Sequence, residues 1–149
     1  MKFDLILHDG KIMNGVDEFP QNFDIGIKND KIISVGDLKN EYSTKKINCK
    51  NLIILPGVID TQVHFREPGL THKEDIECAS KAAVMGGVTA FCEMPNTNPL
   101  TTSEKEFNWK LSKAKNVSWC DYSFFIGATP NNICLLYTSD LPTSYPVYI

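Results

Sequence analysis

The sequence has no long run of apolar residues and no excess of positive charge. No stretch approaches the roughly 20 apolar residues that cross a bilayer, and the opening MKFDLILHDG carries acidic and polar side chains too early for a secretion signal. The 149 residues have a net charge of -3 without a long block of either sign. This disfavours nucleic acids and anionic membrane surfaces as partners. We therefore expect a cytoplasmic protein with a small-molecule substrate.

Paired cysteines are absent as well. The five cysteines are odd in number and include no C-x-x-C pair, so neither a disulfide framework nor a thiolate zinc site is indicated. We expect most of them to be small buried side chains; they are Cys49, Cys78, Cys92, Cys120 and Cys134. The composition, with 42% hydrophobic and 22% charged residues, is that of an ordinary globular domain.

Three regions of the chain differ in pattern. Residues 1–51 hold short alternating apolar runs, and Asn29-Asp30 is a turn signal between two of them, which predicts a small antiparallel β unit. Residues 52–133 alternate strands, expected in LIILPGVID, VTAFCEM and CDYSFFIGA, with two helices. That order is typical of an α/β protein with a parallel sheet. Residues 134–149 contain prolines and tyrosines without a helical period.

The two helices have start signals in the sequence. Thr71 with Glu74, and Ser103 with Glu106, have the spacing of a capping box, in which side chains satisfy free backbone N–H groups. The first helix is expected to end at Gly86-Gly87. Apolar residues at helical spacing predict one face of each helix against the sheet: Ile76, Ala79 and Ala83 in the first, Phe107, Leu111 and Ala114 in the second.

Polar side chains follow two of the predicted strands. DTQVHFREPG occupies residues 60–69, and EMPNT follows the next strand at 93–97. In parallel α/β proteins ligands bind beyond the carboxyl ends of the strands. An imidazole there can bind a metal, a guanidinium can grip a carboxylate, and an amide can donate a further hydrogen bond. His64, Arg66 and Asn96 are therefore candidates for a site that binds an anionic small molecule beside a metal.

Simpler interpretations of these residues stay open. His64 can be an ordinary hydrogen-bonded residue, Arg66 with Glu67 can form a surface ion pair, and the PNTNP segment can be turn chemistry alone. We interpret His8, in the β unit, and His72, in the expected first turn of a helix, as structural or solvated.

PGVIDTQVHFREPGLTHKED followed by GGVTAFCEMPNTNP closely resembles the dihydroorotases of the amidohydrolase superfamily. The resemblance covers about residues 3–130 and implies the N-terminal part of a metal-dependent (β/α)8, TIM-like barrel, preceded by strands of a small β-sandwich. It also implies reversible hydrolysis of dihydroorotate to N-carbamoyl-aspartate in pyrimidine synthesis, with zinc as the cofactor. His64 matches the second His of the family's H-x-H metal motif, and Arg66 and Asn96 match the residues that hold the substrate carboxylate.

The chain departs from the family pattern at Gln62, where most members have His. A carboxamide oxygen is a weaker zinc ligand than an imidazole nitrogen, so the number of metals stays open. A non-catalytic homologue that serves as an assembly partner, for example of aspartate transcarbamoylase, is the alternative that Gln62 favours. Another cyclic amidohydrolase, of the allantoinase or hydantoinase type, is the second alternative. A homo-oligomer is a further expectation for the full-length parent.

The second departure is length. A (β/α)8 barrel takes about 250 residues, whereas 98 residues follow residue 51, so we expect an incomplete barrel. The resemblance places the remaining metal ligands and the catalytic aspartate downstream, and no appreciable catalysis is expected from the 149 residues alone. CLLYTS at 134–139 matches the translation of a sequencing adapter. Residues 134–149 are accordingly expected to be an artefactual or divergent tail.

Overall fold

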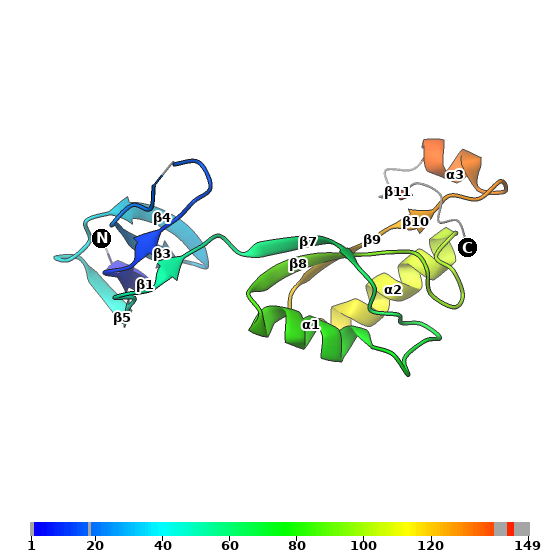
Figure 1. The fold of residues 1–149 in the computed structure, drawn as a ribbon, viewed down its shortest axis with the longest axis horizontal. Coiled ribbons are helices and arrows are strands. Elements are labelled where there is room, and N and C mark those ends of the chain that lie inside the picture. The colour runs from blue at the N-terminus through cyan, green and yellow to red at the C-terminus, as the bar shows by residue number, and fades with distance from the viewer. Residues whose placement is uncertain (1, 18, 139–142, 145–149) are drawn as a thin grey trace. The chain divides into compact units, whose positions relative to one another are not determined.

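The computed structural model describes residues 2–17, 19–138 and 143–144 (Figure 1). The chain divides into two compact units, with the boundary after Pro56. Each unit is described by itself below. None of the helices in the described part of the chain has the length and apolarity that crossing a bilayer requires.

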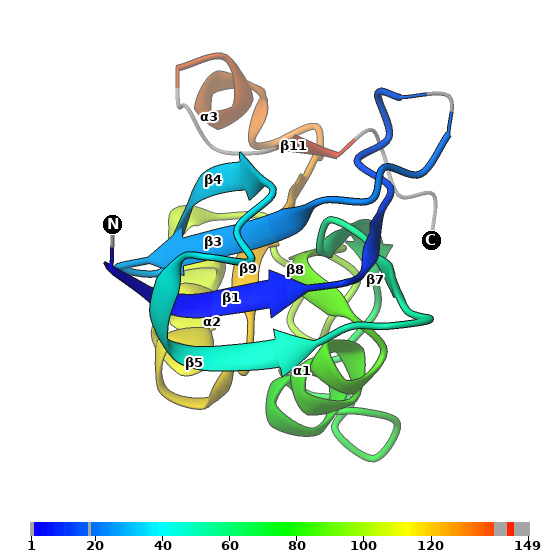
Figure 2. The same ribbon diagram turned by 90° about the vertical axis from the view of Figure 1, so that its left-hand side faces the viewer.

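The first unit is built on a four-stranded sheet with the order β4-β3-β1-β5 (Figure 2). Its strands are β1 (Lys2–His8), β3 (Asp24–Lys28), β4 (Lys31–Gly36) and β5 (Tyr42–Asn48). The predicted turn is confirmed, because Asn29 and Asp30 both have positive φ, 50° and 58°, as tight hairpin turns require. The expectation of a purely antiparallel unit is wrong. The chain crosses from β4 to the far side of β1, so β5 pairs with β1 in parallel.

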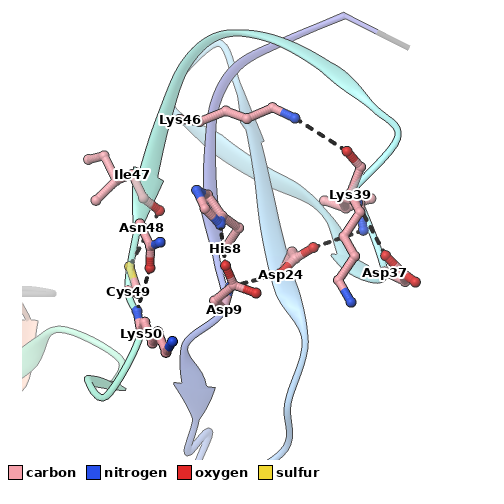
Figure 3. A network of polar contacts seen from close by, with 11 residues as sticks. His8, Asp9, Asp24, Asp37, Lys39, Lys46, Ile47, Asn48, Cys49 and Lys50 are labelled. Atoms are coloured by element: carbon pink, nitrogen blue, oxygen red, sulfur yellow. Dashed lines mark hydrogen bonds and ion pairs between the residues drawn. The ribbon is translucent and has the colours of Figure 1, made fainter.

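Local hydrogen bonds hold the loops of this sheet. His8 Nδ1 lies 2.7 Å from Asp9 Oδ2, so His8 has the structural role expected of it (Figure 3). The buried carboxylate of Asp24 accepts the backbone N–H groups of Asp9, at 3.1 Å, and Leu38, at 3.0 Å. Leu38 packs with Phe3 and Ile6 in a small core. The polar network therefore ties the loop after β4 to the sheet.

The apolar run at residues 52–59 does not form one strand, contrary to the prediction. Its first part is β6 (Ile53–Ile54), which pairs in parallel with β2 (Lys11–Ile12). Its second part begins β7 (Val58–Val63), which belongs to the other unit. The Pro56-Gly57 step separates them, and proline interrupts strand pairing because it lacks an N–H group.

The second unit has the predicted parallel sheet, with the order β7-β8-β9. Here β8 is Val88–Glu93 and β9 is Asp121–Phe124, and the helices α1 (Ile76–Met85) and α2 (Glu104–Val117) lie on one face of the sheet (Figure 1). A single apolar cluster joins the sheet to both helices: Ile76, Phe91, Phe107, Ala114, Phe124 and Ile126. The strand β7 lies at the edge of this sheet, and its Ile59 is 63% exposed despite its apolar character.

Side chains cap both helices, and one of the two caps is the residue predicted from the sequence. Ser103 caps α2 as expected, because its Oγ accepts the N–H of Lys105 and also contacts the carboxylate of Glu106. The capping box at Thr71 and Glu74 is wrong, since α1 is capped by Asp75, which accepts the N–H of Cys78 at 2.8 Å. Residues 71–73 form a turn before the helix, and His72 lies exposed in that turn. The expected end at Gly86 is confirmed.

A short helix, α3 (Ile133–Thr138), follows β10 (Ile126–Gly127), where no helical pattern was expected. Six residues are fewer than two turns, so they cannot show a helical repeat. The side chain of Asn132 precedes the helix and donates to the carbonyl oxygens of Thr102 and Gly127, both at 2.8 Å. Thr143–Ser144 form β11, which pairs with β10. The other residues of the predicted tail from 139 onward lie outside the described residues.

Of the five cysteines, only Cys49 is buried. Cys78 and Cys134 are exposed, and Cys92 and Cys120 are half-buried. The prediction that most cysteines are buried is therefore wrong. Cys78 lies on the outer face of α1, where a helix presents side chains to solvent whatever their polarity.

Candidate functional site

The ends of β7 and β8 bring two of the predicted site residues into contact. His64 follows β7 directly, and Asn96 lies in the loop after β8. Because the two strands are parallel neighbours, their carboxyl ends meet at one edge of the sheet. His64 Nδ1 lies 2.9 Å from Asn96 Oδ1. The PNTNP segment is thus more than a turn, since its Asn96 side chain contacts the neighbouring strand end.

This contact selects the proton position on the imidazole of His64. A carboxamide oxygen only accepts hydrogen bonds, so a neutral His64 carries its proton on Nδ1. The lone pair then lies on Nε2. Metal-binding histidines typically donate from one nitrogen to a protein acceptor and bind the metal through the other. His64 therefore fits the role of a single imidazole ligand.

The rest of a metal site is not present among the described residues. Gln62 lies exposed near the end of β7, and its backbone N–H donates to Asp60 Oδ1 at 3.0 Å. Within residues 2–17, 19–138 and 143–144, no group of three or more His, Cys, Asp or Glu side chains could hold a metal ion. A zinc site needs about four ligands. The described residues supply one imidazole and the weaker amide of Gln62, which do not make a complete zinc site.

Arg66 lies in the loop after β7 in an unusual backbone conformation. Its φ is 68°, in the left-handed region that non-glycine residues rarely adopt. Its carbonyl oxygen accepts the N–H of Leu70 at 3.1 Å, and its side chain is half-buried. The backbone therefore turns sharply at this residue.

Glu67, the next residue, does not form the surface ion pair with Arg66 that was one of the open alternatives. Its buried carboxylate accepts the N–H of Ile76 at the start of α1, at 3.0 Å, and lies 3.1 Å from Lys113 Nζ on α2. A carboxylate at a helix N-terminus is stabilised by the helix dipole. Glu67 thus connects the loop to both helices and, with the Asp75 cap, fixes the start of α1.

A buried ion pair lies beneath this loop. Glu93, the last residue of β8, and Lys110 of α2 are both 0% exposed, with 3.0 Å between Glu93 Oε2 and Lys110 Nζ. Burial raises the pKa of Glu93, and the charge of Lys110 opposes that rise. Burial likewise lowers the pKa of Lys110, against the charge of Glu93. The carboxylate oxygens have no hydrogen bond of ordinary geometry, so the pair is held mainly by its charges.

The ion pair should give stability a distinctive pH dependence. Because folding raises the Glu93 pKa above its ordinary 4.5, the stabilising contribution of this group is present below pH 4.5 and is lost as the pH rises through the raised value. The lowered pKa of Lys110 has the opposite effect, so stability is regained as the pH approaches 10.5. We expect the free energy of unfolding, relative to the Glu93→Met/Lys110→Met variant, to pass through a minimum between these limits. Urea denaturation of both proteins at a series of pH values measures this difference. A difference in unfolding free energy that does not change with pH would contradict the prediction.

The two site loops are also joined through their backbones. The N–H of Asn98 donates to the carbonyl oxygen of Pro68 at 3.0 Å. Gly69 has a φ of 81°, and a Cβ atom at this position would overlap the carbonyl of Asn98. Glycine is therefore required here for two reasons, its backbone conformation and the close approach of the second loop.

The hollows near these loops do not enclose a complete ligand site. One of about 510 Å³ is lined by Pro68, Pro99 and the outer face of α2, including Trp109, but by neither His64 nor Arg66. A second, of about 60 Å³, is lined by Asn96 and residues of the β10 segment. It has room for a water molecule or two rather than a ring. The site residues thus form an open arrangement at the strand ends.

The sequence analysis does not predict the ion pairs of Glu67 with Lys113 and of Glu93 with Lys110. For Lys110 the sequence does contain a signal of burial. Lys110 lies three residues after Phe107 and four before Ala114, on the apolar face predicted for α2. A charged residue on such a face needs a buried partner.

Comparison with known proteins identifies one family for this chain. A family model described as "Dihydro-orotase-like" matches residues 51–128. The chain is 39% identical over 114 residues to the dihydroorotase of Clostridioides difficile, a match that covers 75% of this chain and 27% of that protein. The chain therefore spans less than a third of the length of this relative.

Solved structures of related enzymes share the fold. The L-hydantoinase (dihydropyrimidinase) from Arthrobacter aurescens superposes with a TM-score of 0.83 at 26% identity, covering 90% of this chain and 30% of that one. A D-aminoacylase studied for its binuclear metal centre superposes with a TM-score of 0.51 at 27% identity, covering 61% of this chain and 18% of that one.

Proposed function

The chain belongs to the dihydroorotase-like family, and from this membership we propose that the complete protein is a dihydroorotase. Such an enzyme opens the cyclic amide of dihydroorotate to N-carbamoyl-aspartate and also catalyses the reverse ring closure. The proposal includes a small-molecule substrate, zinc as the metal and a cytoplasmic location. The described second unit would be the N-terminal part of a (β/α)8 barrel, and the first unit would be part of a small β-sandwich.

The observation that carries the proposal is the contact between His64 and Asn96 beside Arg66. The Oδ1 atom of Asn96 is used by the imidazole, which leaves the Nδ2 hydrogens for a ligand. A guanidinium and an amide donor on adjacent strand ends suit a carboxylate, which accepts several hydrogen bonds at once. Dihydroorotate carries such a carboxylate on its ring, so Arg66 and Asn96 would orient the ring through it.

His64 would present Nε2 to the metal while Asn96 holds its Nδ1 proton. When bound, zinc supplies a polarised carbonyl and a water of lowered pKa. One imidazole and Gln62 are too few ligands for this, so the proposal requires further ligands that the described residues do not supply. For the same reason, the 149-residue chain by itself is expected to show no turnover.

The proposal is tested by a substrate panel on the full-length protein that carries this chain. We expect hydrolysis of dihydroorotate and cyclisation of N-carbamoyl-aspartate, and at least about tenfold lower kcat/KM for hydantoin and allantoin, which lack the carboxylate. The 149-residue chain serves as the negative control. Preference for an uncharged ring would instead indicate a hydantoinase or allantoinase.

One observation favours a second candidate function. Gln62 is exposed at the position that the family resemblance assigns to the first His of the H-x-H motif, and an amide is a weaker zinc ligand than an imidazole. A full-length protein that binds no zinc, turns over no substrate and co-purifies with aspartate transcarbamoylase would be a non-catalytic assembly partner. Metal analysis by mass spectrometry separates this candidate from the enzyme.

A further inference from the structure

Arg66 lies in its loop between two residues whose side chains are anchored. Before it, the ring of Phe65 packs against the ring of Phe91 in β8, with 4.6 Å between the ring centroids. After it, the side chain of Glu67 is buried even though the residue belongs to a loop. The backbone of Arg66 is therefore fixed by both of its neighbours in the sequence.

Each oxygen of the Glu67 carboxylate has its own partner, and the two partners belong to different helices. Oε2 accepts the N–H of Ile76, the first residue of α1, at 3.0 Å. Oε1 lies 3.1 Å from Lys113 Nζ on α2. A carboxylate that is bound at both oxygens has a fixed direction as well as a fixed position. Glu67 thus holds the backbone directly after Arg66 at a set place relative to both helices.

The conformation of Arg66 needs support of this kind. Its φ of 68° is unfavourable for a residue with a Cβ atom, and such a conformation persists only where the surrounding structure holds it. The turn that results is closed by the N–H of Leu70, which donates to the carbonyl oxygen of Arg66 at 3.1 Å. Protection of the Leu70 amide from exchange therefore reports whether this turn is formed.

We propose that Glu67 is a positioning residue for Arg66: bound by Ile76 and Lys113, it holds the Arg66 backbone in the conformation that directs the guanidinium toward a substrate carboxylate. The direction toward a substrate rests on the proposed function. The hold on the backbone does not.

A role in starting α1 does not account for both contacts of Glu67. The helix already has a cap in Asp75, which accepts the N–H of Cys78 at 2.8 Å. The side chain of Lys113 is 38% exposed, and an ion pair with so exposed a lysine adds little stability. Its effect is to fix Oε1, and with it the direction of the whole carboxylate. The contact with Lys113 is therefore explained by the geometry that it imposes on the loop.

Two matched variants of the 149-residue chain test the hold on the backbone. Glu67→Ala and Asp75→Ala each remove one side-chain acceptor from the start of α1, but only Glu67 adjoins Arg66. We expect hydrogen exchange of the Leu70 amide to accelerate about tenfold or more in Glu67→Ala and to stay unchanged in Asp75→Ala. Equal acceleration in both variants, or none in either, would overturn the proposal.

Kinetics of the full-length protein test the consequence for the substrate. Glu67→Ala should raise KM for dihydroorotate about tenfold with little change in kcat, as expected for a misplaced binding group. In an Arg66→Met background the same change should have no further effect on KM, because Glu67 acts through Arg66. Asp75→Ala should leave KM unchanged. A rise in KM that is as large without the guanidinium as with it would show a general disturbance and would overturn the proposal.

A second variant decides the matter if Glu67→Ala fails to fold. Glu67→Gln/Lys113→Met keeps an acceptor for the N–H of Ile76 and removes only the hold from α2. It should raise KM about threefold, the effect of losing a half-exposed ion pair, and again only where Arg66 is present. An unchanged KM in this variant would overturn the proposal.

Failure of the proposal and failure of the proposed function give different results. If Arg66→Met leaves KM for dihydroorotate unchanged, the carboxylate role of Arg66 is wrong, while the exchange of the Leu70 amide still tests the hold by Glu67. If Arg66→Met raises KM and Glu67→Ala does not, the positioning role is wrong and the proposed function stands.

Discussion

Replacing Lys110 by methionine is expected to lower the free energy of unfolding by about 3–5 kcal/mol, because it leaves the carboxylate of Glu93 buried without its partner. Both side chains are 0% exposed, so solvent cannot take over the role of the lysine. Methionine is about as long as the aliphatic part of lysine, so the loss of unfolding free energy comes from the missing charge rather than from a cavity. Urea denaturation of the 149-residue chain at neutral pH measures it.

The same substitution should be less harmful in acid. Glu93 can escape its unfavourable burial by taking up a proton, which its raised pKa already favours. The destabilisation by Lys110→Met is therefore expected to shrink as the pH falls toward 4.5. Lys115→Met, an exposed change on the same helix, should stay within about 0.5 kcal/mol of the unaltered chain at either pH. A loss below about 1 kcal/mol for Lys110→Met at neutral pH would mean that water reaches Glu93 in solution.

In the full-length protein, Arg66→Met is expected to reduce kcat/KM for dihydroorotate by about 10²-fold or more. Two hydrogen bonds from a guanidinium to a carboxylate are worth about 1.5–3 kcal/mol each, and a loss of 2.7 kcal/mol is about a hundredfold. Steady-state kinetics on dihydroorotate and on the same ring without its carboxylate measure the effect. The second substrate should lose little, because it never contacted the guanidinium.

Two controls sharpen this test. Arg66→Lys keeps the charge but loses the forked geometry, so it should fall between the native enzyme and the methionine variant. His72→Ala, in the exposed turn before α1, should behave like the native enzyme. An equal loss on both substrates would show that the substitution disturbs the loop rather than carboxylate recognition.

Much of the fold could be predicted from local patterns. The Asn29-Asp30 turn and the Ser103 cap depend on residues within a few positions of one another, and the order of strands and helices is visible as a change of apolar period. The meeting of His64 and Asn96 followed from one rule, that parallel strands end at the same edge. These features need no knowledge of distant contacts.

The features that could not be predicted depend on side-chain pairings that neither a local pattern nor the strand-end rule specifies. The start of α1 is set by Asp75 and by Glu67, which lies nine residues before Ile76, and the spacing of Thr71 and Glu74 carries no information about Glu67. The pairing of Glu93 with Lys110 joins a strand to the following helix. Charged residues are normally assigned to the surface, and only the position of Lys110 on an apolar helix face argues otherwise. Burial of charge is a property of the assembled structure.

The backbone contacts between the two site loops have a consequence for evolution. The loops are held together by the bond from Asn98 to Pro68 and by the close fit of Gly69, and none of these uses the side chains of His64, Arg66 or Asn96. Those side chains can therefore be exchanged by mutation while the loops keep their places. A lineage built on this arrangement could change the ring it accepts through single substitutions. Gly69, by contrast, should tolerate almost none.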